Sequence, residues 1–105
     1  MVEDGTREGS RRRALEAITK LSVVVTRGPD AGTLVEIPSG ESASVGTAPN
    51  NDVRLKDPTV SRYHLELAPT REGVRVTDLG STNGTFAGAI RLTTGSIPRG
   101  TQLRI

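Results

Sequence analysis

Apolar and polar residues alternate in short runs through most of the chain, from Leu21 to Ile105. Gly, Pro, Asn and Asp separate the runs, which recur about every ten residues. Alternation with a period of two is typical of strands that bury one face. No helical pattern interrupts the runs, so the sequence predicts an all-β sandwich or barrel. The apolar positions of these runs are Val23, Val25, Val35, Ile37, Ala43, Val45, Val53, Leu55, Leu65, Leu67, Val74, Val76, Phe86, Ile90, Leu92, Leu103 and Ile105.

Residues 1–20 follow a different pattern, because they are polar, charged and poor in large apolar side chains. This composition predicts disorder for residues 1–9. Residues 10–20 are compatible with a short helix, since Ser10 is an acceptable cap and apolar residues follow it at helical spacing. Such a helix is marginal by itself in water and needs a surface to pack on. We therefore expect a flexible, disordered or partly helical tail over residues 1–20 and one β domain over residues 21–105.

The composition decides the kind of core and limits the chemistry. A chain of 105 residues fits one domain, and with one Phe, one Tyr and no Trp its core must be built from Val, Leu and Ile. The absence of Cys excludes disulfides and thiolate metal sites. A single His and scattered carboxylates argue against a zinc or di-metal site, and we expect no metal and no cofactor.

The charge distribution argues against nucleic-acid and membrane partners. The formal net charge is +2, much of the excess lies in the arginines at positions 11–13, and the rest of the chain is mixed in sign. No stretch is long enough to span a membrane, and residues 2–9 are too polar for a signal peptide. With no Cys either, we expect a cytoplasmic protein. The last strand pattern ends at Ile105 without a polar tail, so we interpret the chain as a piece of a longer protein.

Three turn-rich segments carry the candidate chemistry, at residues 46–52, 57–64 and 78–85. Each is rich in hydroxyl and amide side chains, which donate hydrogen bonds to phosphate oxygens and to a peptide backbone. If the strands on either side are neighbours, all three segments meet at one end of the sandwich. Loops on a rigid scaffold are where binding usually takes place.

The order of these motifs resembles a forkhead-associated (FHA) domain. The motifs are Gly46, then SRYH at residues 61–64, then LGSTNGTF at residues 79–86, and the similarity extends over residues 21–105. The resemblance implies an all-β, FHA-type sandwich of about ten to eleven short strands, with the last strand missing here. It also implies binding of phosphothreonine in peptides.

The resemblance assigns roles to single residues. Ser61 resembles the serine that hydrogen-bonds the phosphate, and Arg62 resembles the variable residue beside it that reaches the peptide or phosphate. Thr82 resembles a phosphate-side contact, and Asn83 resembles the amide that clamps the peptide backbone. His64 resembles the family's structural histidine, which ties the loops together from beneath.

The segment that begins at Gly46 departs from the family pattern. Gly46 resembles the turn glycine that opens the first loop, and Gly84 belongs to the structural support of the site. The residue after the turn glycine is usually an Arg that contacts the phosphate, but here it is Thr47. A neutral hydroxyl does not offset the charge of a dianion, so phosphate binding is expected to weaken. Arg62 is the best available substitute for the missing cation.

The sequence favours a phosphothreonine-peptide-binding regulatory module, and the chain looks similar to FHA domains at the front of bacterial sigma-54-dependent transcriptional activators. Its partner is then a phosphothreonine-containing protein, its own chain or a Ser/Thr kinase included, and any DNA contact is made by domains outside this chain. Thr47 supports an alternative, a phosphate-independent protein-interaction domain on the same scaffold.

Two further function classes have less support. A nucleic-acid-binding domain would fit the sequence pI of about 9.7, but only Tyr63 and Phe86 are available to stack on bases. An enzyme is not expected, because no nucleophile–base pair is present. Taken alone, Ser61 would be interpreted as a turn residue that bonds its own backbone. Its occurrence together with His64 and Asn83 in the motif favours the binding role.

Overall fold

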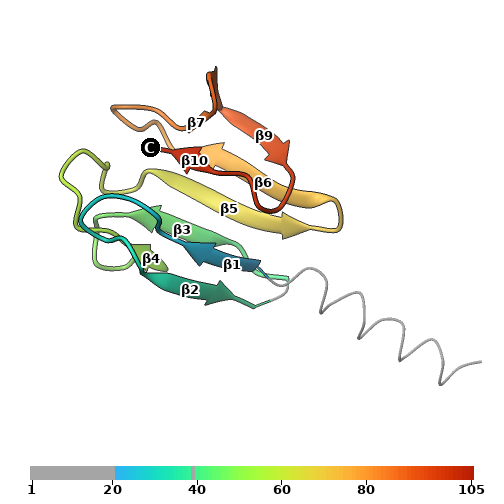
Figure 1. Cartoon of the computed structure of the whole chain (residues 1–105), viewed down its shortest axis with the longest axis horizontal. Helices are drawn as coiled ribbons and strands as arrows, with labels where there is room; N and C mark the ends of the chain where they lie inside the picture. Colours follow the sequence, from blue (N-terminus) through green and yellow to red (C-terminus); the bar gives the residue numbers. More distant parts are fainter. Residues whose placement is uncertain (1–20, 39) are drawn as a thin grey trace, which may run out of the picture.

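The computed structural model describes residues 21–38 and 40–105, and the predicted tail at residues 1–20 lies outside the described residues. The described part contains ten strands in three sheets and no helix (Figure 1). The all-β prediction is therefore confirmed. The strands are β1 (Leu21–Val24), β2 (Leu34–Ile37), β3 (Ala43–Gly46), β4 (Val53–Arg54), β5 (Leu65–Thr70), β6 (Gly73–Asp78), β7 (Phe86–Ala87), β8 (Ile90–Arg91), β9 (Thr94–Ile97) and β10 (Leu103–Arg104).

The largest sheet has the strand order β4-β3-β5-β6-β9, a second sheet is the hairpin β1-β2, and the third has the order β10-β7-β8. β3 and β4 pair in parallel, and all other neighbours are antiparallel. The centre of the large sheet is the β5-β6 hairpin, whose register extends from Leu65 opposite Asp78 to Thr70 opposite Gly73.

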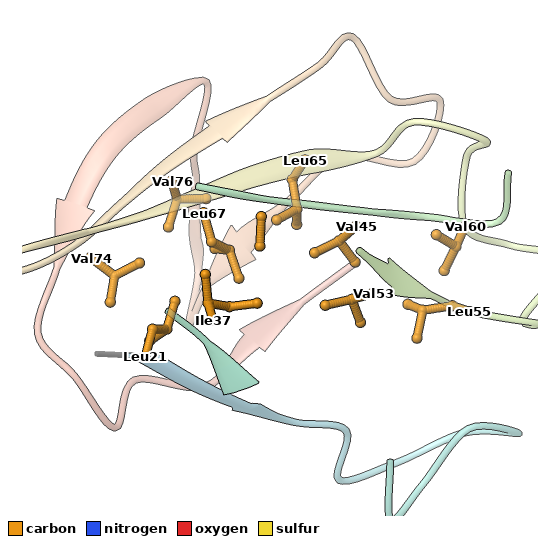
Figure 2. Packing of buried hydrophobic residues seen from close by; sticks show 11 residues of the cluster. Leu21, Ile37, Val45, Val53, Leu55, Val60, Leu65, Leu67, Val74 and Val76 are labelled. Carbon is orange, nitrogen blue, oxygen red and sulfur yellow. The ribbon is translucent and has the colours of Figure 1, made fainter. Parts of the chain in front are cut away.

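The core lies between the large sheet and the β1-β2 hairpin, as Figure 2 shows for Leu21 and Ile37 below and Leu67 and Val74 above. The alternation predicted from the sequence is observed in the burial. In β4, for example, Val53 is buried while the next residue is exposed. Each aliphatic side chain buried in this way contributes about 1.5–3 kcal/mol relative to an exposed position.

Two details of the strand pattern differ from the expectation. Ile90 belongs to the predicted alternation, yet 66% of its surface is exposed, because it lies on a two-residue strand at the edge of its sheet. β9 is not apparent from the sequence, since Thr94–Ile97 has one large apolar side chain. It forms because β6 offers an edge, and the register runs from Thr77 opposite Thr94 to Val74 opposite Ile97.

Three connections emerge at one end of the sandwich, on the left in Figure 1. They are the 47–52 loop between β3 and β4, the 55–64 loop between β4 and β5, and the 79–85 loop between β6 and β7. The three segments singled out in the sequence therefore lie at the same end of the fold.

Candidate functional site

The 47–52 and 55–64 loops are held together by hydrogen bonds that involve the backbone. The N–H of Thr47 donates to the carbonyl of Ser61 at 3.1 Å, and the N–H of Ala48 donates to the carbonyl of Arg62 at 3.1 Å. The side-chain amide of Asn51 donates to the same Arg62 carbonyl at 2.7 Å. These bonds fix the backbone of two predicted site residues, Ser61 and Arg62, against the 47–52 loop.

The 79–85 loop is joined to the 55–64 loop by two further bonds. The N–H of Thr82 donates to the hydroxyl oxygen of Ser61 at 3.0 Å, and the side-chain amide of Asn83 donates to the carbonyl of Thr59 at 2.8 Å. Because the Ser61 oxygen accepts this bond, its own proton is left to donate to another group. Ser61 is thus the point where the two loops meet.

His64 supports both loops from beneath. It has no exposed surface, its Nδ1 accepts the N–H of Ser61 at 3.1 Å, and its Nε2 lies 2.9 Å from the carbonyl of Gly84. Nδ1 faces a donor and Nε2 faces an acceptor, so the ring proton is on Nε2. Both ring nitrogens are occupied by backbone groups, which leaves His64 without the free nitrogen that a general base needs.

Two glycines stand where the space or the backbone conformation of these loops disfavours a side chain. A Cβ atom on Gly46 would collide with the backbone carbonyl group of Arg62, so the close approach of the two loops requires a residue without a side chain. Gly84 has φ of +89°, and a Cβ there would lie 2.9 Å from the ring of Phe86. Both glycines lie behind the predicted binding residues rather than among them.

Asp78 organises the 79–85 loop, a role that was not predicted from the sequence. Its carboxylate accepts bonds from the N–H of Gly80 at 3.0 Å, the N–H of Ser81 at 2.9 Å and the hydroxyl of Ser81 at 2.6 Å. It also accepts the hydroxyl of Thr85 at 2.7 Å, and the Ser81 oxygen in turn accepts the N–H of Gly84 at 3.0 Å. The signal available in the sequence was an Asp three residues before a Ser, which is typical of a local side-chain turn.

These hydrogen bonds change the acidity of Asp78. Partial burial acts to raise the pKa of the carboxyl group, but the hydroxyls of Ser81 and Thr85, together with two backbone N–H groups, outweigh it. They lower the pKa from 3.8 to about 2. The folded state therefore favours the ionised carboxylate, and its stabilisation is present above about pH 4 and is lost as the pH falls toward 2.

Replacing Asp78 with Asn is expected to lower the free energy of unfolding by about 2 kcal/mol at pH 7, because an amide turns an NH₂ group toward N–H and hydroxyl donors. Between pH 4 and 2 the variant is expected to lose less stability than the parent does. Urea denaturation across this pH range measures both effects. Glu66→Gln, on the exposed face of β5, is the matched control and is expected to change stability by less than about 0.5 kcal/mol. An Asp78→Asn protein as stable as this control would contradict the role of the carboxylate.

The three loops enclose an open groove with a volume of about 700 Å³. All five predicted binding residues line it, whereas Gly46, His64 and Gly84 do not. Tyr63 forms part of the wall, and its hydroxyl donates to the side chain of Asn50 at 2.7 Å. The lining residues are Thr47, Pro58, Thr59, Val60, Ser61, Arg62, Tyr63, Leu79, Gly80, Thr82 and Asn83.

Arg62 is the one charged side chain among the described residues that line this groove, and it is exposed to solvent. Arg54 lies outside the groove, where its Nε is 3.4 Å from the carbonyl of Thr47. Residues 21–38 and 40–105 contain no cluster of three potential metal ligands. In the same residues no helix has the length and hydrophobicity needed to cross a membrane.

Comparisons with known proteins place this arrangement of loops in a family. Residues 24–105 match the family model described as the cytoplasmic domain of an inner membrane component of the type III secretion system. A solved FHA domain, analysed for phosphothreonine-dependent interactions, superimposes with a TM-score of 0.70 at 28% identity, over 82% of this chain and 86% of that one. The chain belongs to the matched family and is an FHA domain.

Curated relatives agree with the assignment of this FHA domain. The oxoglutarate dehydrogenase inhibitor of Corynebacterium jeikeium is 30% identical over 106 residues, which cover 99% of this chain and 73% of that protein. The FHA domain-containing protein FhaB of Mycolicibacterium smegmatis is 36% identical over 84 residues, or 79% of this chain. The match spans 54% of FhaB, so about half of that relative lies outside the similarity.

Proposed function

We propose that this FHA domain binds a phosphothreonine-containing segment of a partner protein in the groove between its three loops. The observation that carries the proposal is the convergence of Thr47, Ser61, Arg62, Thr82 and Asn83 on one groove, where Arg62 is the cation among the lining residues that the structure describes. Several hydrogen-bond donors around one positive charge are complementary to a phosphate group. The solved FHA domain similar to this chain engages in phosphothreonine-dependent interactions, which supports the same ligand class here.

In this proposal each side chain has a separate task. The free hydroxyl proton of Ser61 and the hydroxyl of Thr82 donate to phosphate oxygens, while Arg62 supplies the charge. Asn83 uses one N–H to hold Thr59, which leaves its carbonyl oxygen and second N–H for the backbone of the bound peptide. Thr47 adds a neutral hydroxyl at the position where the family usually has Arg.

We further propose that the domain is a non-catalytic regulatory module of a cytoplasmic bacterial signalling protein. The relative named as an oxoglutarate dehydrogenase inhibitor supports this class. That the domain forms the N-terminal part of a sigma-54-dependent activator stays a prediction from resemblance. The identity of the partner as a Ser/Thr kinase or the chain itself stays a prediction, and so does DNA contact by other domains.

The test is a titration with two degenerate peptide libraries that differ only in a central phosphothreonine or threonine. We expect binding of the phosphorylated library alone, measured by calorimetry and by shifts of the Ser61 and Asn83 amide signals. Arg62→Gln is expected to weaken it about tenfold or more, because one charge-assisted contact contributes about 1.5–3 kcal/mol. Thr47→Arg is expected to strengthen it by a similar factor. Arg75→Gln, an exposed arginine of β6, is the matched control.

Thr47 also supports a second candidate, a phosphate-independent interaction domain. It predicts equal binding of the two libraries, or binding of neither, and no loss of partner binding in Arg62→Gln. Equal shifts of the Ser61 and Asn83 signals by both libraries would therefore exclude the phosphothreonine proposal and favour this one.

A further inference from the structure

Two arginines flank the one phenylalanine of the chain on the outer face of the β10-β7-β8 sheet. Arg104 lies directly opposite Phe86 in the β10-β7 register, and Phe86 lies opposite Arg91 in the β7-β8 register. The guanidinium carbon of Arg104 is 4.3 Å from the centre of the Phe86 ring, and that of Arg91 is 5.9 Å away. We name these three side chains the arginine row.

The row faces away from the core. Leu103, the neighbour of Arg104 on β10, packs against the core cluster, so the alternate residues of that strand point outward. Both arginines are exposed, while Phe86 is half-buried between them. Contact with the ring limits the motion of the two guanidinium groups, which lowers the entropy cost of binding a further group.

Neither arginine of the row forms an ion pair with a carboxylate of residues 21–38 or 40–105. Residues 79–105 contain three arginines and no Asp or Glu. Among the described residues, Phe86 is the partner that the structure gives to Arg91 and to Arg104. Guanidinium groups bind carboxylates with two parallel hydrogen bonds, so the row is complementary to acidic side chains.

The row is continuous with the groove. A Cβ on Gly84 would lie 3.1 Å from Nε of Arg91, so Arg91 packs directly on the 79–85 loop. Thr82 and Asn83, which line the groove, immediately precede this glycine. A residue spans at most about 3.6 Å, so the row begins within about 7 Å of the groove. Three neighbouring strands extend the row over about 10 Å, which equals about three residues of an extended peptide.

We propose that the arginine row binds acidic side chains of the partner within about three residues of the phosphothreonine, which gives the domain a preference for acidic phosphopeptides. This inference rests on the proposed function of the groove. A peptide fits the row better than a nucleic acid does, because the Phe86 ring is covered by arginines and is not free to stack on a base.

The experiment compares three degenerate phosphothreonine libraries at low salt. One has Gln at the three positions on each side of the phosphothreonine, one has Glu at the three positions before it, and one has Glu at the three positions after it. We expect one of the Glu libraries to bind about threefold to tenfold more tightly than the Gln library, and the gain to disappear at high salt. The double variant Arg91→Gln, Arg104→Gln is expected to lose this gain while it keeps its affinity for the Gln library.

The control variant Arg75→Gln removes one positive charge from β6 and is expected to keep the full gain. Equal binding of all three libraries by the parent protein would overturn the inference, whether or not the double variant folds. A gain that persists in the double variant, or that Arg75→Gln removes equally, would also overturn it. If no phosphorylated library binds, both the proposed function and the inference are wrong. If the phosphorylated libraries bind without a preference for Glu, only the inference is wrong.

Discussion

Replacing His64 with Ala is expected to lower the free energy of unfolding by about 3–5 kcal/mol and to abolish binding in the groove. His64 is fully buried, and its ring nitrogens bond the N–H of Ser61 and the carbonyl of Gly84. The substitution leaves a cavity and two backbone groups without partners, and each buried unpaired group costs about 1–3 kcal/mol. A typical domain has about 5–15 kcal/mol of total stability, so the effect is a large part of it.

Urea denaturation measures this loss, and Tyr63→Phe is the matched control. Tyr63 is the neighbouring residue, it is 44% exposed, and the change removes one hydrogen bond to Asn50 near solvent. We expect the control to lose less than about 1 kcal/mol. A His64→Ala protein that loses no more than Tyr63→Phe would show that the ring does not hold the two loops together.

Replacing Gly46 with Ala is expected to lower the free energy of unfolding by about 2–4 kcal/mol and to eliminate peptide binding. The added methyl group meets the carbonyl group of Arg62, which belongs to the backbone and does not rotate away. The 55–64 loop must then move, and it loses the bonds from Thr47, Ala48 and Asn51 that hold it. Because Ser61 and Arg62 move with this loop, their donors no longer converge on one phosphate.

The matched control for Gly46→Ala is Gly95→Ala. Gly95 is also a strand glycine, but a Cβ there meets its nearest neighbour, Leu92, at an ordinary 3.5 Å. Its stability is expected to change by less than about 1 kcal/mol, and its phosphopeptide affinity is expected to stay the same. Urea denaturation measures the stability of both variants, and the library titration measures their phosphopeptide affinity. Parent-like binding by Gly46→Ala would mean that the two loops need not lie in contact.

The strands that carry the core were predictable because each of them buries one face. Val53 and Val76, for example, are buried beside the exposed residues Arg54 and Arg75, and a period of two marks such a strand locally. β9 was not predictable in this way. Thr94–Ile97 pairs with β6 through its backbone, and backbone bonds leave no trace in the pattern of side chains.

Some residues of the site were likewise predictable from the sequence and others were not. Residues 61–64 and 79–86 were identifiable because their motifs resemble the FHA family, and their binding roles stay predictions. The role of Asp78 was not predictable, because it depends on four donors that surround the carboxylate only after the loop has folded. The arginine row was not predictable either, since Arg91 and Arg104 are far apart in the sequence and come together beside Phe86 only through strand pairing.

The sequence by itself determined the all-β class, the aliphatic core and the three loops that carry hydroxyl and amide side chains. These features depend on local periodicity and on residue type, which the chain displays directly. Only the tertiary structure decided that the loops share one groove and that Arg62 is the charged residue among the described residues that line it. The tertiary structure also decided that His64 and Asp78 hold the loops in place. These features depend on contacts between residues distant in the chain, and such contacts exist only once the sheets have paired and packed.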